Sequence, residues 1–369
     1  MIVIGLFAVI TLAILAEAIV KPNFYKYVIM LFSMVSGLVF AFSFFEPLSK
    51  IVSKINWFPA AAEGLSFVLI FGISFAILKL LGDFTIRPEL KLPDIVNRSF
   101  SALFSLIFSF FVTGMIIVFL SMMPMESKYP YPRYANKPIV TNSNYEIAPD
   151  NTFLNLDSAV TGFYNMLSAG SLSGDKNFGI VHDNFIDTNF LDRALYEEGV
   201  SPIAGEKAID VPNTPQAVRK APKLMKYDEV NQVVKKISGK QMFLVKVEIS
   251  QDKVKNGGII EKGGGYEIGP AQLRLICNKN YADMFKGDGL SVFPVGYVTD
   301  NSKFKKFDLK SKFNLLPHKP DKNKNAVLDV GFYVPEGYVP VALELRQDDI
   351  ARVPNVNAEP EEEQSEQNG

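Results

Sequence analysis

The sequence contains few side chains of the kinds that bind metals or form covalent intermediates. It has one cysteine, Cys277, and two histidines, His182 and His318. A single cysteine excludes an intramolecular disulfide and a multi-cysteine zinc site. His182 and Asp183 form half of a metal-binding pattern, but no second histidine–carboxylate pair follows at a useful spacing. We therefore expect no metal site and no cofactor, and we interpret His182 as a surface or loop-ordering residue.

Two further patterns lack the surroundings that their chemistry requires. The run Gly263-Gly264-Gly265 is not followed by Gly-Lys-Ser/Thr or by a helix start, so it predicts a hairpin connection and not a phosphate-binding loop. The serines at 168, 171 and 173 lack the Gly-x-Ser-x-Gly setting of a hydrolase nucleophile. Because no catalytic arrangement is present, we predict that the protein is not an enzyme.

The most regular spacing of polar residues lies in an uncharged stretch from Ser99 to Pro124. Ser101, Ser105, Ser109 and Thr113 recur every four residues, so they share one slowly drifting face of a helix. Small residues let helix backbones approach closely, and their hydroxyls can bond to a carbonyl one turn back. We interpret this face as a packing seam. The alternative is the polar lining of a path for a solute or proton, as in a channel or transporter subunit.

Two other apolar stretches repeat the spacing of small residues every four positions. The first contains Ser33, Gly37 and Ala41, and the second contains Gly72 and Ala76. We predict that these two faces meet the seam at the centre of a helix bundle.

These residues must be positioned by membrane-spanning helices. The mean hydropathy is +0.13 although 21% of the residues are charged, so the apolar residues are concentrated in part of the chain. Four stretches reach the roughly 20 residues that cross a bilayer core. They are 1–20, 28–45, 58–81 and 99–124. We predict a transmembrane domain of four helices at 1–124. A signal peptide is the alternative for the first stretch, but a basic start and an Ala-x-Ala site are missing.

Charged residues suggest an orientation and argue against a proton-driven transporter. Loops 1 and 3 contain six lysines and arginines, against five on the opposite side, and no basic residue precedes the first helix. The positive-inside rule then places both termini outside the cytoplasm. Glu17, Glu63 and Lys79 lie near predicted helix ends, where their side chains can reach water. No charged residue occupies the centre of a predicted span.

The remaining two-thirds of the chain predict a soluble part. Residues 125–150 are rich in proline and tyrosine and predict a spacer, and 151–240 predict a helical and loop region with an amphipathic helix at 155–167. From 241 to 354 the apolar period changes to two, which predicts an antiparallel β-sandwich. Its expected strands are 243–249, 272–277, 290–298, 327–334 and 341–346. Residues 355–369 predict a disordered acidic tail. The fold class is thus an all-α membrane domain followed by an α+β soluble domain.

Taken in sequence order, these features make the chain resemble the colicin V production protein (CvpA) family. It would be a member with an added C-terminal domain of the kind seen in planctomycete-type bacteria. The resemblance rests on the four-helix layout, on Phe45-Glu46-Pro47-Leu48, and on Asn97-Arg98 before the fourth helix. The family usually has Asp-Arg at that position, so this cytoplasmic-loop motif departs from it by one residue. The run Leu167–Phe185 also resembles the segment that follows the membrane domain in such proteins.

The resemblance implies an inner-membrane protein associated with toxin production or export, or with envelope homeostasis, and it carries no catalytic residues. The lipid bilayer is the first expected partner, and we expect an envelope protein to bind the β domain. A homo-oligomer is possible. The balance of 38 basic against 39 acidic residues argues against nucleic-acid binding.

Overall fold

The computed structural model divides the chain into two compact units, which are described separately. Unit 1 comprises residues 1–137, 148–173 and 184–197, and unit 2 comprises the rest. The described residues are 2–54, 59–85, 92–134, 152–170, 174–197, 207–229, 232–234, 236–250, 253–254, 266–315, 325–346 and 349–355. Most of the predicted acidic tail therefore lies outside the described residues.

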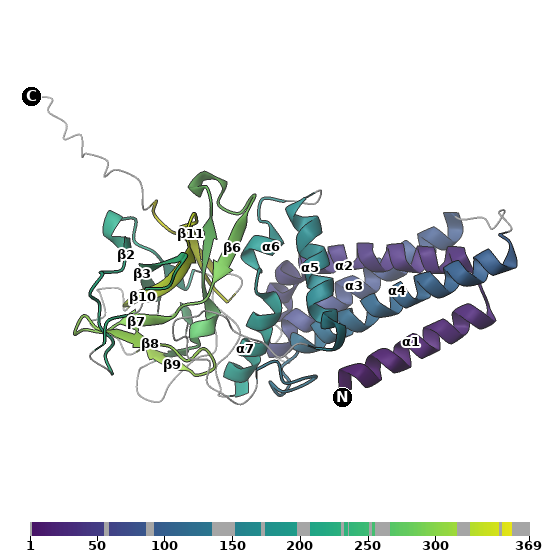
Figure 1. Ribbon diagram of the computed structural model, residues 1–369, viewed down its shortest axis with the longest axis horizontal. Helices are drawn as coiled ribbons and strands as arrows, with labels where there is room; N and C mark the ends of the chain where they lie inside the picture. The colour runs from purple at the N-terminus through teal and green to yellow at the C-terminus, as the bar shows by residue number, and fades with distance from the viewer. Residues whose placement is uncertain are drawn as a thin grey trace, which may run out of the picture. The chain divides into compact units, whose positions relative to one another are not determined.

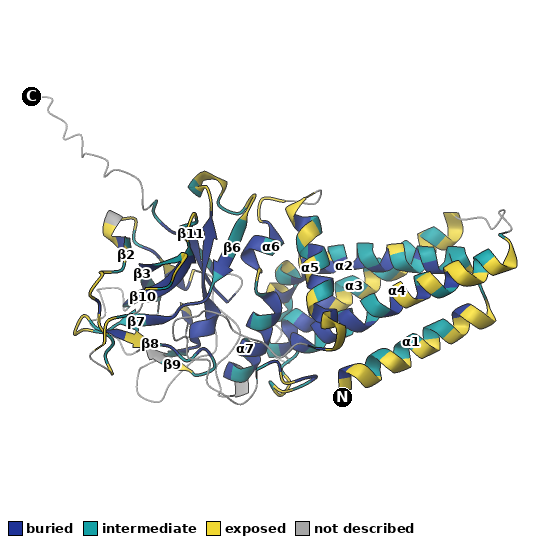
Figure 2. Ribbon diagram, viewed as in Figure 1, coloured by how far each residue is buried: buried dark blue, intermediate teal, exposed yellow. Residues whose placement is uncertain are grey.

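Unit 1 contains four helices that are long and apolar enough to cross a membrane, which confirms the prediction. They are α1 (Ile2–Val20), α2 (Phe24–Val52), α3 (Ala62–Thr85) and α4 (Asp94–Ser121). Helix α2 packs against both α3 and α4, and α1 packs against α4, so the helices follow the order α3, α2, α4, α1. Figure 1 shows α1 alongside α4. Its outer face carries Val9 and Leu12, each 67% exposed, as expected for side chains that face lipid (Figure 2).

Two shorter helices, α5 (Leu156–Ala169) and α7 (Phe185–Glu197), also belong to unit 1. Helix α5 corresponds to the expected amphipathic helix and packs against α4 and α2. Its apolar face requires Gly114 on α4, because a Cβ there would lie 2.5 Å from both the Leu156 carbonyl oxygen and Val160 Cγ2. Helices α5 and α7 of the predicted helical and loop region thus pack with the membrane helices within unit 1.

Unit 2 is β-rich and antiparallel, as predicted. One sheet has the order β1-β3-β10-β7-β8, with β2 also paired to β3, and a second has the order β12-β11-β5-β6. Strands β4 and β9 form a small third sheet. The first sheet contains β1 (Ile209–Asp210), β2 (Val218–Lys220), β3 (Lys240–Ser250), β7 (Gly296–Val298), β8 (Phe304–Lys306) and β10 (Asn325–Pro335). The others contain β4 (Tyr266–Ile268), β5 (Leu273–Asn278), β6 (Gly289–Val292), β9 (Phe313–Leu315), β11 (Val339–Leu345) and β12 (Asp349–Arg352).

One expected strand of unit 2 is wrong, and two strands of unit 2 carry no sequence signal. The expected strand 290–298 is divided into β6 and β7, which belong to different sheets. Pro294 lies between them and has no N–H group to continue a ladder. The proline-rich stretch before Lys226 carries no apolar period, yet β1 and β2 within it pair with β3. Short edge strands with charged residues need no alternating pattern of their own.

A pair of glycines makes room for the Phe304 ring of β8 on the first sheet. Gly296 of β7 lies directly opposite Gly331 of β10. A Cβ on Gly296 would lie 2.8 Å from the Phe304 ring, and one on Gly331 would lie 2.6 Å from it. The ring therefore occupies the space that two side chains would fill, and it packs in a cluster with Met225, Met242, Leu244 and Tyr333.

Candidate functional site

The predicted seam on α4 is buried throughout. Ser101, Ser105, Ser109 and Thr113 are each 0% exposed. The Ser105 hydroxyl donates to the Ala102 carbonyl at 2.8 Å, and Thr113 donates to the Ser109 carbonyl at 2.8 Å. Across the helices, Thr11 of α1 donates to the Ser109 hydroxyl at 3.2 Å. These contacts are those of close helix packing.

The other small residues behave differently on the two helices. Ser33, Gly37 and Ala41 are buried on α2, and a Cβ on Gly37 would lie 3.3 Å from the Phe71 ring of α3. Gly72 and Ala76 of α3 are exposed, and a Cβ on Gly72 would meet nothing within 4 Å. The predicted meeting of three faces is therefore corrected, because α3 turns Phe71 and Phe75, and not Gly72 and Ala76, toward Gly37 of α2.

Asn97 of the predicted loop motif joins α4 to the turn between α1 and α2. Its Oδ1 accepts a hydrogen bond from the Phe24 amide at 2.9 Å, and its Nδ2 donates to the Pro22 carbonyl at 3.0 Å. The amide side chain supplies the acceptor and the donor on separate atoms, as these two contacts require. Arg98 is exposed. The motif thus holds two helix starts together through Asn97.

We predict that Asn97→Asp destabilises unit 1 by about 1–2 kcal/mol, because a carboxylate cannot donate to the Pro22 carbonyl. Asn23→Asp is the matched control. Asn23 only accepts a hydrogen bond, from the Lys26 amide at 3.1 Å, and aspartate keeps that contact. Thermal unfolding of the purified protein in detergent measures both effects. Equal midpoints for the two variants would contradict the prediction.

A buried polar cluster joins the segment after α4 to α5 and α7. Tyr131 donates to Asp157, and Tyr134 donates to Asp187. Arg133 donates to Asp187 Oδ1 at 2.7 Å and to the Tyr131 hydroxyl at 2.9 Å. Arg133 is 6% exposed and Asp157 is 0% exposed. The Arg133 guanidinium and the two tyrosine hydroxyls therefore compensate the two carboxylates for their loss of water contacts.

Arg193 of α7 completes the attachment of this segment. Its guanidinium donates to the Leu120 carbonyl at 3.2 Å and to the Met125 carbonyl at 3.3 Å. It also donates to the Glu126 and Tyr129 carbonyls. The Leu120 carbonyl belongs to the last turn of α4 and the other three belong to the segment that follows it, so one arginine binds both to α7. The described part of the predicted spacer, 125–134, contacts α5 and α7 through these side chains, while 135–150 lie outside the described residues.

Alkaline pH tests this cluster. Burial first, and then the charge of Asp157, raises the pKa of Tyr131, and burial with Asp187 raises the pKa of Tyr134. A raised pKa stabilises the fold below the unfolded value of about 10, and that stabilisation is lost as the pH rises toward the folded value. We expect neither tyrosine to ionise near pH 10. Absorbance titration of the wild type against Tyr131→Phe/Tyr134→Phe measures this, and a two-tyrosine difference near pH 10 would contradict it.

His182 and Cys277 in unit 2 show no sign of a reactive site. His182 is 4% exposed and its ring lies 4.5 Å from the Phe178 ring, so the surface interpretation is wrong and packing explains the residue. Cys277 is 0% exposed on β5, and burial raises the pKa of its thiol. Among the described residues no group of three or more His, Cys, Asp or Glu side chains is placed to hold a metal ion.

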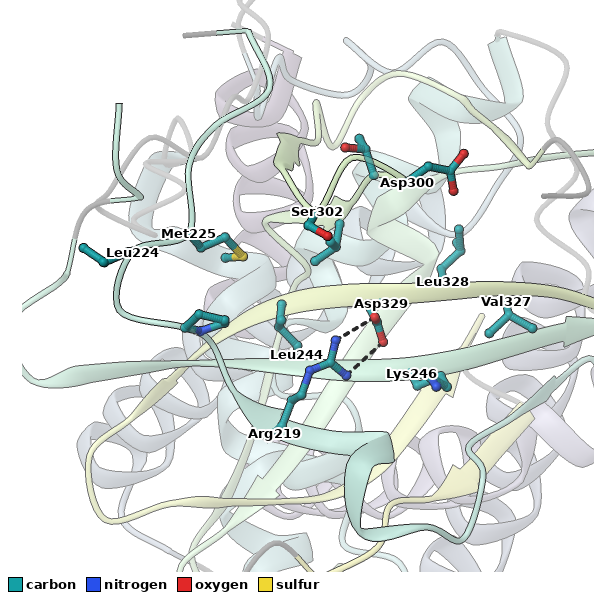
Figure 3. Close-up of a pocket in the computed structure, with 13 residues that line it drawn as sticks. Arg219, Leu224, Met225, Leu244, Lys246, Asp300, Ser302, Val327, Leu328 and Asp329 are labelled. Atoms are coloured by element: carbon teal, nitrogen blue, oxygen red, sulfur yellow. Dashed lines mark hydrogen bonds and ion pairs between the residues drawn. The ribbon is translucent and has the colours of Figure 1, made fainter. Parts of the chain in front are cut away.

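Unit 2 has a groove of about 570 Å³ over the first sheet (Figure 3). Its floor includes Leu244 and Lys246 of β3 and Asp329 of β10, and Leu224 and Ser302 lie on its rim. Arg219 of β2 binds Asp329 through two contacts of 2.7 and 3.2 Å. The sequence did not indicate this groove, because Arg219 and Asp329 are 110 residues apart and neither belongs to a motif.

The structure thus defines a multi-pass membrane protein with an attached antiparallel β unit. Residues 2–144 match the family model described as Colicin V production protein, which confirms the resemblance for the membrane region. No curated protein and no solved structure matches the chain. The matched region contains α1 to α4, and the strands of unit 2 lie beyond it.

Proposed function

We propose that the protein is a non-catalytic component of the inner membrane that acts in colicin V-type toxin production or export, or in envelope homeostasis. In this proposal unit 2 lies outside the cytoplasm and binds another envelope component. The observation that carries the proposal is the family match across the four apolar helices.

Charge and helix number support the proposed orientation. Four spans return the chain to the side on which it began, so the N-terminus and the end of α4 share one side of the membrane. The six-to-five bias of lysines and arginines toward loops 1 and 3 favours the outside for both.

The contacts in the membrane unit support a packing role over the transporter alternative. The hydroxyls of Ser105, Ser109 and Thr113 donate to carbonyls of their own helix. The charged groups of the Arg133 cluster are buried and bond to one another. The groove of unit 2, with apolar and charged side chains together, supplies a surface of the kind that binds a partner.

Two experiments test the proposal. Protease added to spheroplasts is expected to digest unit 2 and leave the loop between α3 and α4 intact. Protection of unit 2 would overturn the orientation. A photo-cross-linking amino acid at Ser302, on the groove rim, is expected to capture an envelope protein in intact cells, whereas the same residue at exposed Lys279 is not. Equal capture at both positions, or only cytoplasmic proteins, would overturn the binding role.

A further inference from the structure

A strongly basic loop forms one side of the groove. The eight residues Arg219–Lys226 contain four basic residues and no acidic one. Lys220, Lys223 and Lys226 are exposed and form no ion pair with any residue that the structure describes. Between the lysines, Leu224 is 79% exposed, and it lines the groove. We call Arg219–Lys226 the basic loop.

The neighbouring strand adds to this positive charge. The Phe304 amide of β8 donates to the Lys226 carbonyl at 2.8 Å, so β8 runs beside the basic loop. Lys305 is exposed, and Lys306 lies 4.2 Å from the centre of the Tyr227 ring. Four acidic side chains lie near the basic loop: Asp329 binds Arg219, Asp228 lies 4.0 Å from Lys303, Asp300 lines the groove, and Glu229 is exposed. Six basic residues, the four of the basic loop with Lys305 and Lys306, outnumber them. The region therefore carries a positive excess on a chain whose net charge is -1.

The chain itself contains a segment of complementary charge. Residues 356–369 include five glutamates and no basic residue. Fourteen residues can extend to roughly 46 Å. The preceding strand, β12, begins at Asp349, which accepts a hydrogen bond from the Ile209 amide of β1 at 2.7 Å. Strand β12 itself belongs to the second sheet, but Asp349 bonds it to β1. Because β1 and β2 pair with β3 at positions four residues apart, the strand that precedes the acidic segment adjoins the sheet that carries the groove.

We propose that the acidic segment 356–369 docks on the basic loop of the same molecule and covers the groove. Attachment to the same chain gives the segment a high effective concentration, so contacts that are individually weak are sufficient. While the acidic segment occupies the groove, no other ligand can bind there. A more acidic or more apolar ligand would have to displace the segment. This inference does not depend on the proposed envelope partner or on the orientation of the protein.

Disulfide cross-linking of the purified full-length protein in detergent tests docking without any partner. Leu224→Cys combined with Glu362→Cys is expected to form an intramolecular disulfide under mild oxidation. Lys279→Cys combined with Glu362→Cys is the control, because Lys279 is exposed on unit 2 but does not line the groove. Cys277 is 0% exposed and should not interfere.

The charge contribution has its own matched comparison. Lys223→Gln/Lys226→Gln is expected to lower the cross-linking rate about fivefold, the effect of losing two exposed ion pairs. Lys279→Gln/Lys286→Gln, which removes two charges elsewhere, is expected to leave it unchanged. About 1 M salt, where the Debye length is roughly 3 Å, should also lower the rate.

Three results would overturn the inference. They are equal rates for the groove and control cysteine pairs, rates that respond neither to salt nor to the lysine substitutions, and products that are only covalent dimers. Dimers would assign the groove to a second copy of the chain. No envelope partner is present in this assay. A negative result would therefore contradict docking of the acidic segment but not the proposed function, which cross-linking in cells tests separately.

Discussion

Replacing Arg274 with methionine is expected to destabilise unit 2 by about 3–5 kcal/mol, because it takes the charged partner away from a buried carboxylate. Arg274 of β5 lies directly opposite Glu344 of β11, and Arg274 Nη2 is 2.7 Å from Glu344 Oε2. The two side chains are 1% and 0% exposed, so water cannot replace the lost contact. This loss is a large share of the free energy of unfolding of a typical domain, which is about 5–15 kcal/mol.

The same substitution at a more exposed ion pair is the matched control. Arg219 also binds a carboxylate, that of Asp329, but their side chains are 38% and 23% exposed. Water compensates such a loss, so Arg219→Met should cost no more than about 1 kcal/mol. Arg274→Met/Glu344→Leu should recover much of the lost stability, because it removes both charges of the buried pair. Thermal unfolding with limited proteolysis of the β unit measures all three variants. Equal losses for Arg274→Met and Arg219→Met would contradict the prediction.

Adding one methyl group at Gly114 is expected to displace α5. The new Cβ would lie 2.5 Å from the Leu156 carbonyl oxygen and 2.5 Å from Val160 Cγ2. The carbonyl is backbone, so it cannot move without the helix. Overpacking of this kind costs about 1–3 kcal/mol. The shift would also strain the Asp157 contacts and the 2.9 Å hydrogen bond between Tyr164 and Ser43.

Gly72→Ala is the control for Gly114→Ala, because it makes the same change inside a neighbouring apolar helix. Nothing lies within 4 Å of the added Cβ, so only backbone entropy changes and stability should rise by about 0.5–1 kcal/mol. The thermal midpoint in detergent and the rate of proteolysis within α5 report both variants. Gly114→Ala with wild-type values in both assays would show that α5 does not depend on close approach to α4.

The membrane spans and the strand-rich character of unit 2 could be predicted from the amino-acid sequence alone. A run of about 20 apolar residues has few alternatives to a spanning helix. Alternation such as Val245, Lys246 and Val247 similarly indicates a strand, and β3 contains these residues. The family resemblance was also accessible, since it depends on the order of such local patterns.

Which residues meet one another became visible only in the folded chain. Asp157 and Asp187 carried no signal, yet they bind Tyr131, Arg133 and Tyr134 from a segment that composition alone assigned to a spacer. Gly37 and Ala41 of α2 have the same spacing as Gly72 and Ala76 of α3. The two residues of α2 are buried, whereas the two residues of α3 are exposed.

The range of the interactions explains this difference. Apolar runs and periods report how a residue relates to solvent or lipid within one element. Whether a charged side chain is buried depends on a partner distant in sequence, as with Arg274 and Glu344, which are 70 residues apart. A sequence pattern specifies the surface that an element must bury, and the packing of the other elements specifies what buries it.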